Sequence, residues 1–137
     1  MSLLVFVYGT LKRGLNNSHY LAGQRFVGEA HTQPVYRMVD CGGYPGMFSV
    51  AENRLSIAGE IWEVTERCLA RLDLLEDVAG GEYERVMVSL LPPYADGSVQ
   101  GYLYLRDPSF LRDAGDNWMD TSATPLGLAS RGKSGQG

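Results

Sequence analysis

The sequence predicts a single α+β domain that combines several short strands with one main helix. Residues 3–8 (LLVFVY) form a short apolar run that stops at Gly9, and this pattern is typical of a strand buried on both faces. Residues 66–78 repeat their apolar positions with a helical period. Residues 82–91 alternate between two faces, and residues 99–105 return as the second strand of a hairpin. A chain of 137 residues can bury the core of one such domain.

Composition narrows the class of protein. A formal net charge of −4 argues against a nucleic-acid binder, which would carry a basic face. No stretch approaches the roughly 20 apolar residues of a membrane span, and residues 1–4 lack the features of a signal peptide. Cys41 and Cys68 do not make a disulfide framework. We therefore expect a cytoplasmic protein with free thiols and no membrane partner. The two histidines lack ligand spacing, so no metal site is expected.

The turn after the first strand is the first candidate binding feature. Gly9 has no Cβ, so its backbone can take a positive φ or approach a ligand closely. Unpaired main-chain N–H groups at such a strand end form a small site for an anion. The alternative is an ordinary tight turn. Residues 9–14 (GTLKRG) are not a phosphate-binding P-loop, because the Gly-Lys-Ser/Thr ending is missing.

Between this turn and the main helix we expect further strands and loops. Residues 25–39 contain a proline and fit an edge strand or two short strands. Residues 41–46 (CGGYPG) form a loop by composition. Residues 55–64 are rich in β-branched and aromatic residues, which predicts a long strand with a possible bulge at Gly59.

The helix predicted over residues 66–78 has Thr65 as its N-cap and ends before two glycines. Glu76 falls within its apolar face, whereas Leu74 projects outward. A buried carboxylate is costly, and the removal of water raises its proton affinity. Glu76 is therefore either paired with a cation such as Arg85 or kept as an acid/base group, unless it lies at the edge of this face and reaches solvent. The apolar residues predicted to share its face are Cys68, Leu69, Leu72, Leu75 and Ala79.

The end of the chain is expected to be less regular. Residues 107–113 open with Asp-Pro and are predicted to form a short helix. From residue 121 the composition turns to Ser, Gly, Ala and Thr, which predicts a disordered tail over residues 121–137. The folded domain is accordingly expected to span residues 1–120.

Several segments together form a recognisable pattern: VFVYGTLKRG at 5–14 with Asn17 and Leu21 following, GEIWEV at 59–64, LDLLE at 72–76, YER at 83–85 and GYLY at 101–104. With these segments the chain resembles the γ-glutamylcyclotransferase superfamily, in its AIG2-like, γ-glutamylamine cyclotransferase branch. The resemblance covers roughly residues 3–120 and implies a small, mixed, mostly antiparallel, barrel-like sheet with one main helix packed on it.

The resemblance implies an enzyme that needs no cofactor and acts on a small γ-glutamyl molecule. In this family the α-amine of a γ-glutamyl compound attacks its own γ-carbonyl, giving 5-oxoproline and a free amine. By resemblance, Glu76 is the catalytic residue that deprotonates the ammonium and then protonates the leaving amine. A pKa raised by burial would suit both steps. The residues implied to bind substrate are Tyr8, Gly9, Thr10 and Leu11, with the aromatic positions Tyr83 and Tyr104 near the pocket.

Two other functions are compatible with the same fold. One is a non-catalytic module that binds a small molecule, since a fold does not determine a function. The other is a biosynthetic cyclase that removes a γ-glutamyl protecting group from a larger intermediate. The carboxylate of Glu76 on an apolar helix face favours an enzyme over the binding module.

Overall fold

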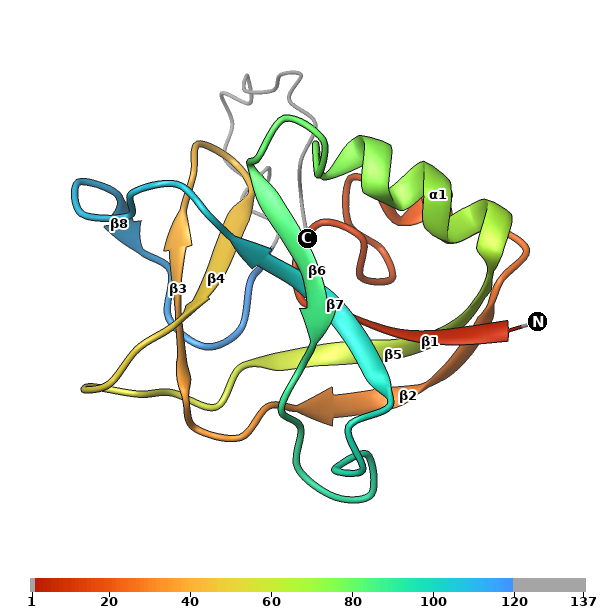
Figure 1. The fold of residues 1–137 in the computed structure, drawn as a ribbon, viewed down its shortest axis with the longest axis horizontal. Helices are drawn as coiled ribbons and strands as arrows, with labels where there is room; N and C mark the ends of the chain where they lie inside the picture. The colour runs from red at the N-terminus through yellow and green to blue at the C-terminus, as the bar shows by residue number, and fades with distance from the viewer. Residues whose placement is uncertain (1, 120–137) are drawn as a thin grey trace.

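The computed structural model describes residues 2–119 and contains two sheets and one α-helix (Figure 1). The tail predicted to be disordered, residues 121–137, lies outside the described residues. Along the chain the elements are β1 (Ser2–Val7), the 3-10 helix η1 (Ser18–Leu21), β2 (Arg25–His31), β3 (Tyr36–Asp40), β4 (Pro45–Ser49), β5 (Ala58–Thr65), α1 (Glu66–Leu75), β6 (Tyr83–Met87), β7 (Val99–Tyr104) and β8 (Arg112–Asp113).

The larger sheet has five strands in the order β2-β5-β1-β7-β6, and the smaller has three in the order β4-β3-β8. Only the pairing of β1 with β7 is parallel among the strand pairs of the described chain. The prediction of a mixed, mostly antiparallel sheet with one main helix is confirmed. Because the larger sheet runs from the edge strand β2 to the edge strand β6, it stays open and does not close into a barrel.

Strand β1 is buried on both faces, as its unbroken apolar run predicts. Successive side chains of a strand point to opposite faces. Val5 and Val7 belong to the core beneath α1, whereas Phe6 and Tyr8 belong to the core shared with β3 and β4. Figure 1 shows α1 and the β3–β4 pair at opposite ends of the view, with β6 and β7 between them. The central strand thus carries both halves of the hydrophobic core.

The start of α1 and its exposed face follow the sequence. The Thr65 hydroxyl accepts a hydrogen bond of 3.0 Å from the Cys68 N–H, so Thr65 is the N-cap as predicted. Leu74 projects into solvent with 79% of its surface exposed. Ala79, however, is exposed and lies beyond the helix, so its predicted place on the buried face is wrong.

The helix ends earlier than the predicted residue 78. Asp77 takes a left-handed conformation with a φ of 54°, and its N–H donates to the Leu74 carbonyl at 3.1 Å. The N–H of Val78 donates to the Asp73 carbonyl, also at 3.1 Å. This pair of bonds is a Schellman motif, with aspartate at the position that glycine usually occupies. As a result Glu76 is the C-cap residue and does not lie inside the helix.

The irregularity predicted at Gly59 lies on the neighbouring strand instead. The register of β2 against β5 shifts between Phe26 and Gly28. A Cβ at Gly59 would lie 2.5 Å from the Val7 carbonyl oxygen and 2.5 Å from the Phe6 ring. Glycine is required there because β1 packs closely against β5, and not because β5 bulges.

The structure also decides the predictions for residues 25–39 and 107–113. Residues 25–39 form two strands, β2 and β3, on either side of Pro34. The helix predicted for residues 107–113 is wrong. The Asp107 carboxylate accepts the Ser109 N–H at 2.9 Å, which makes a local turn, and residues 112–113 pair with β3 as strand β8.

Candidate active site

The C-terminal end of β1 meets the end of α1 and the start of β6. Glu76, Tyr8 and Tyr83 come from these three elements, and each is completely buried, at 0% exposure. Burial raises the pKa of the Tyr8 phenol, and the Glu76 carboxylate raises it further. Burial likewise raises the pKa of Tyr83, with contributions from Tyr8 and then Glu76. The structure therefore brings together the predicted catalytic carboxylate and two predicted substrate-binding residues.

The hydroxyl of Tyr8 ties the two sheets together. It donates to the Tyr102 carbonyl at 2.8 Å and accepts the Met47 N–H at 3.0 Å. A phenol has one proton to donate, and here that proton is already engaged with β7. The Tyr8 hydroxyl therefore holds β4 against β1 and β7.

The loop after β1 is a run of tight turns. The Lys12 N–H donates to the Gly9 carbonyl at 3.1 Å, and the Leu15 N–H donates to the Lys12 carbonyl at 3.0 Å. Asn17 closes over the loop, because its main-chain N–H bonds the Thr10 carbonyl at 2.8 Å and its side-chain amide bonds the Thr10 hydroxyl at 3.0 Å. The loop is thus held by hydrogen bonds between its own main-chain groups and by the hydrogen bonds of Asn17 to Thr10.

Within that loop, Gly9, Thr10 and Leu11 are all buried. Gly9 does not have a positive φ; in this loop that conformation belongs to Gly14, with a φ of 81°. The expectation of a positive φ at Gly9 is therefore wrong, and its close approach to a ligand stays a prediction. The N–H groups of Gly9 and Leu11 donate no hydrogen bond to another main-chain group in the part of the chain that the structure describes. Such donors at a strand end suit an anion.

Tyr83 and Tyr104 form an aromatic wall beside this loop. Their rings meet edge to face with 5.4 Å between centroids, and the Tyr83 hydroxyl donates to the Pro45 carbonyl at 2.6 Å. Burial raises the pKa of Tyr104 to about 12. A Cβ at Gly46 would lie 2.6 Å from the Tyr104 ring, so glycine is required where β4 passes this wall.

Three residues near the wall were not singled out by the sequence. The Tyr44 hydroxyl donates to the Glu82 carboxylate at 2.6 Å, and Glu82 is itself buried. The Cys41 thiol is close enough to Tyr104 to interact with it, and burial raises the pKa of this thiol to about 12. Composition identifies the glycine-rich segment of Cys41 and Tyr44 as a loop, but no local pattern links it to a carboxylate 38 residues away.

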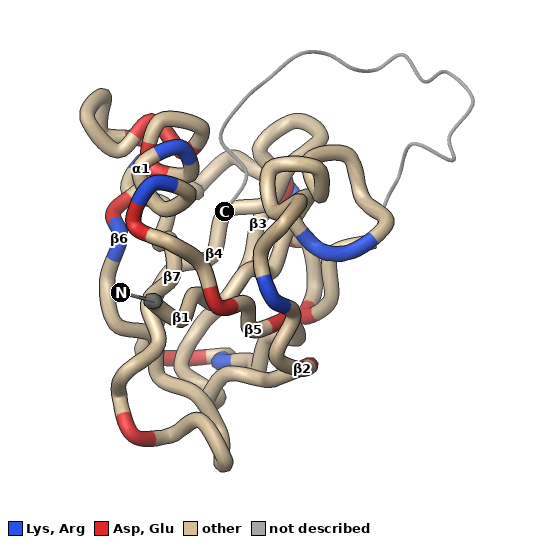
Figure 2. The backbone as a smooth tube through the Cα atoms, turned by 90° about the vertical axis from the view of Figure 1, so that its right-hand side faces the viewer, with Lys and Arg blue, Asp and Glu red and all other residues tan. Residues whose placement is uncertain are grey.

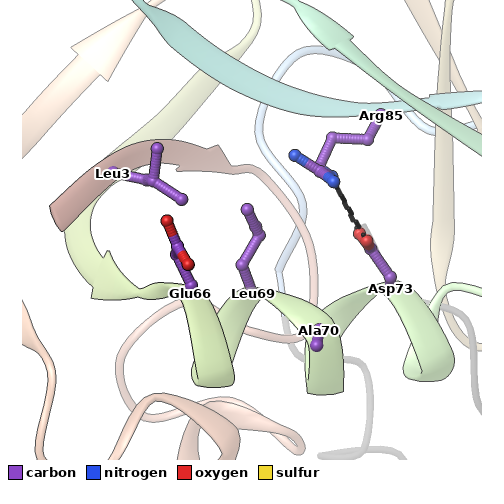
Figure 3. Close-up of a pocket in the computed structure, with 6 residues that line it drawn as sticks. All are labelled: Leu3, Glu66, Leu69, Ala70, Asp73 and Arg85. Atoms are coloured by element: carbon purple, nitrogen blue, oxygen red, sulfur yellow. Dashed lines mark hydrogen bonds and ion pairs between the residues drawn. The ribbon is translucent and has the colours of Figure 1, made fainter. Parts of the chain in front are cut away.

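Arg85, the cation that the sequence suggests for Glu76, is engaged elsewhere. Its Nε donates to the Asp73 carboxylate at 2.9 Å, and Asp73 also accepts the Tyr102 hydroxyl at 2.7 Å. Arg85 and Asp73 both line a surface hollow of about 280 Å³, and Figure 3 shows their ion pair. The residues that line the hollow are Leu3, Glu66, Leu69, Ala70, Asp73 and Arg85. Arg85 therefore pairs with Asp73, which lies on the same helix.

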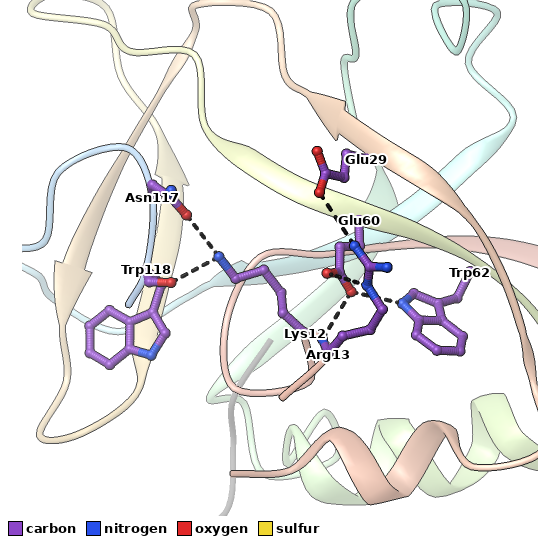
Figure 4. A network of polar contacts seen from close by, with 7 residues as sticks. All are labelled: Lys12, Arg13, Glu29, Glu60, Trp62, Asn117 and Trp118. Carbon is purple, nitrogen blue, oxygen red and sulfur yellow. Dashed lines mark hydrogen bonds and ion pairs between the residues drawn. The ribbon is translucent and has the colours of Figure 1, made fainter. Parts of the chain in front are cut away.

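Lys12 connects the loop to the end of the described chain. Its Nζ donates to the Asn117 side chain at 2.9 Å and to the Trp118 carbonyl at 2.8 Å (Figure 4). Burial lowers the pKa of this lysine. Trp118 is buried in the core shared with β3 and β4, so residues 116–118 lie firmly against the body of the domain.

Over residues 2–119 no group of three or more His, Cys, Asp or Glu side chains is placed to hold a metal ion. Cys41 and Cys68 are both free thiols. None of the helices described is long and apolar enough to cross a membrane. Figure 2 shows acidic and basic positions interspersed along the visible backbone.

Comparison with known proteins agrees with this fold. Residues 5–121 match the family described as gamma-glutamyl cyclotransferase, AIG2-like. A putative gamma-glutamylcyclotransferase of Vibrio cholerae is 39% identical over 116 residues, which is 85% of this chain and 96% of the relative. The gamma-glutamylcyclotransferase family protein YtfP of Escherichia coli K12 is 34% identical over 118 residues, with 85% and 96% covered.

Solved structures show the same architecture. The crystal structure of an AIG2-like protein from Mus musculus superimposes with a TM-score of 0.69 at 29% identity, and the match covers 96% of this chain and 97% of that one. The fold and the matched family together define a cyclotransferase-type domain. The chain belongs to the gamma-glutamyl cyclotransferase, AIG2-like family.

Proposed function

We propose that this protein catalyses the cyclotransferase reaction on a γ-glutamyl amine, with Glu76 as its general base and acid. The α-amine of the substrate attacks the γ-carbonyl carbon, so that a new C–N bond closes the five-membered ring. The bond from that carbon to the leaving amine then breaks. Glu76 takes one proton from the ammonium before the attack and gives it to the leaving nitrogen as that bond breaks. The ring nitrogen loses a second proton after the attack, and this proton ends on the released amine, so the products are 5-oxoproline and a protonated free amine.

The observation that carries the proposal is a completely buried carboxylate beside two buried phenols at the end of β1. Burial disfavours the ionised form of a carboxylate. The C-cap position adds to this effect, because the C-terminal end of a helix carries partial negative charge. A carboxylate whose ionised form is disfavoured in this way is suited both to take a proton and to return it.

The remaining residues bind and fold the substrate. The N–H groups of Gly9 and Leu11, with Thr10 between them, would hold the glutamyl carboxylate or the oxyanion that develops on the γ-carbonyl. Tyr83 and Tyr104 would pack against the substrate chain. Because the nucleophile and the carbonyl belong to one molecule, holding that molecule in a folded shape supplies much of the rate gain.

The direct test is a panel of γ-glutamyl amines with 5-oxoproline and free amine measured together. We expect the two products in equal amounts, and no ¹⁸O in 5-oxoproline when the reaction runs in ¹⁸O-water, because cyclisation consumes no water. The matched control is the Nα-acetyl derivative of the best substrate, which lacks a free amine and cannot cyclise. Release of glutamate would indicate a hydrolase, and thermal stabilisation without any product would indicate a binding module.

A further inference from the structure

Glu60 meets both ends of the loop that follows β1, one end through its strand and the other through its buried carboxylate. In the antiparallel pair of β1 with β5, Glu60 faces Val7, the last residue of β1. The Oε1 atom of Glu60 accepts the main-chain N–H of Arg13 at 3.0 Å (Figure 4). The chain between Val7 and Arg13 includes Gly9 and Leu11, whose N–H groups form the proposed anion site. The start and the end of that segment are therefore set by one side chain and its own strand.

The position of this carboxylate is itself closely determined. Its Oε2 accepts the Nε of Arg13 at 3.1 Å, and its Oε1 also accepts the indole N–H of Trp62 at 3.1 Å. Glu60 is only 7% exposed. The Arg13 guanidinium lies 3.7 Å from the centre of the Phe26 ring, and it also reaches the exposed Glu29. Donors that approach from three groups leave the carboxylate little freedom to move.

We propose that Glu60 is a positioning residue for the main-chain N–H groups of the loop after β1. This inference rests on the proposed function, because it concerns the same anion site. Donors to an oxyanion must lie about 2.7–3.1 Å from it, and a misplacement of about 1 Å can lower a rate about 10²-fold. Glu60 does not touch the reacting atoms in this arrangement; it acts through the loop.

The variant that tests the proposal is Glu60→Gln, which keeps the shape of the side chain. Its carbonyl oxygen can still accept one set of donors, but its NH₂ group then faces the Nε–H of Arg13, so two donors oppose each other. We expect faster amide hydrogen exchange in residues 9–13, with unchanged exchange in β3 and β4. We also expect kcat/KM for 5-oxoproline release to fall about 10- to 10²-fold, with no shift of the pH profile that Glu76 sets.

Two further variants complete the experiment. Glu29→Gln removes the 77%-exposed partner of the same arginine and should leave both exchange and turnover at wild-type values. Arg13→Ala removes the Nε contact but keeps the main-chain bond to Glu60, so its effect should have the same direction and be smaller. If Glu60→Gln does not fold, Arg13→Ala decides the question.

The outcomes separate this inference from the proposed function. Wild-type exchange in residues 9–13 of the folded Glu60→Gln protein would overturn the positioning role, and so would altered exchange with wild-type turnover. If the wild-type protein releases no 5-oxoproline from any γ-glutamyl amine, the proposed function fails, whereas the support of the loop by Glu60 is still decided by exchange.

Discussion

Replacing Glu76 by glutamine separates a catalytic role from a structural one. Glutamine has nearly the same shape as glutamate but cannot exchange protons with the substrate amine. The loss of a general base typically costs about 10²- to 10⁴-fold in rate. We therefore expect the release of 5-oxoproline by Glu76→Gln to fall by at least about 10²-fold.

The stability of the same variant should be retained or increased. Glu76 is completely buried, and a neutral amide is less costly to bury than a carboxylate. The substitution also removes a negative charge from the C-terminal end of α1, where such a charge is unfavourable by about 0.3–1 kcal/mol. An unchanged or slightly higher melting temperature would accompany the loss of turnover.

The matched control is the same chemical change on the same helix, Asp73→Asn. Asp73 accepts two hydrogen bonds from Arg85, at 2.9 and 3.2 Å, and one from Tyr102 at 2.7 Å. Hydrogen bonds to charged groups contribute about 1.5–3 kcal/mol each, and solvent reduces the contribution of this partly exposed ion pair. Asp73→Asn should therefore lower stability by about 1–2 kcal/mol and leave turnover close to the wild-type value.

Melting temperature and 5-oxoproline release are measured on the same preparations of the three proteins. If Glu76→Gln melts at a lower temperature and keeps its turnover, Glu76 is a structural residue and the proposed mechanism is wrong.

Three other perturbations test the surroundings of the site. Tyr8→Phe should destabilise the fold by about 1–3 kcal/mol, because the Met47 N–H and the Tyr102 carbonyl lose their buried partner; chemical denaturation measures this, and an unchanged midpoint would contradict the bridging role. Asp77→Ala should lower the free energy of unfolding by about 1 kcal/mol, because the φ of 54° at this position is unfavourable for alanine. Asp77→Gly should be more stable than Asp77→Ala by most of that amount, and equal stabilities of the two variants would refute the Schellman assignment. The rate at which iodoacetamide alkylates Cys41 should still rise above pH 9. Only the thiolate reacts, and burial in the folded protein raises the pKa of this thiol from 9.0 to about 12. An alkylation rate that levels off near pH 9 would show that the pKa is not shifted. Because folding raises that pKa, the contribution of this thiol to stability is full below pH 9 and declines as the pH rises towards 12.

The features that the sequence determined by itself are those with a local pattern. An unbroken apolar run predicts burial of β1 on both faces, and the structure confirms it. The helical period places Glu76 on the apolar face, and a threonine before the first turn marks the helix start at Thr65. These predictions succeed because each depends on side chains within one or two turns of one another.

Only the tertiary structure decided where the helix ends and which residues far apart in the sequence contact one another. The helix ends at Asp77 because an aspartate takes a left-handed conformation that local propensity would assign to the glycines further on. The Tyr8 hydroxyl meets Met47, 39 residues away, and Glu60 meets Arg13, 47 residues away. A hydrophobic period predicts which face of a strand is buried, but strand order and register determine what lies opposite that face. The carboxylate of the candidate site can therefore be found from the sequence, whereas the residues that hold its surroundings in place are defined only once β1 lies between β5 and β7.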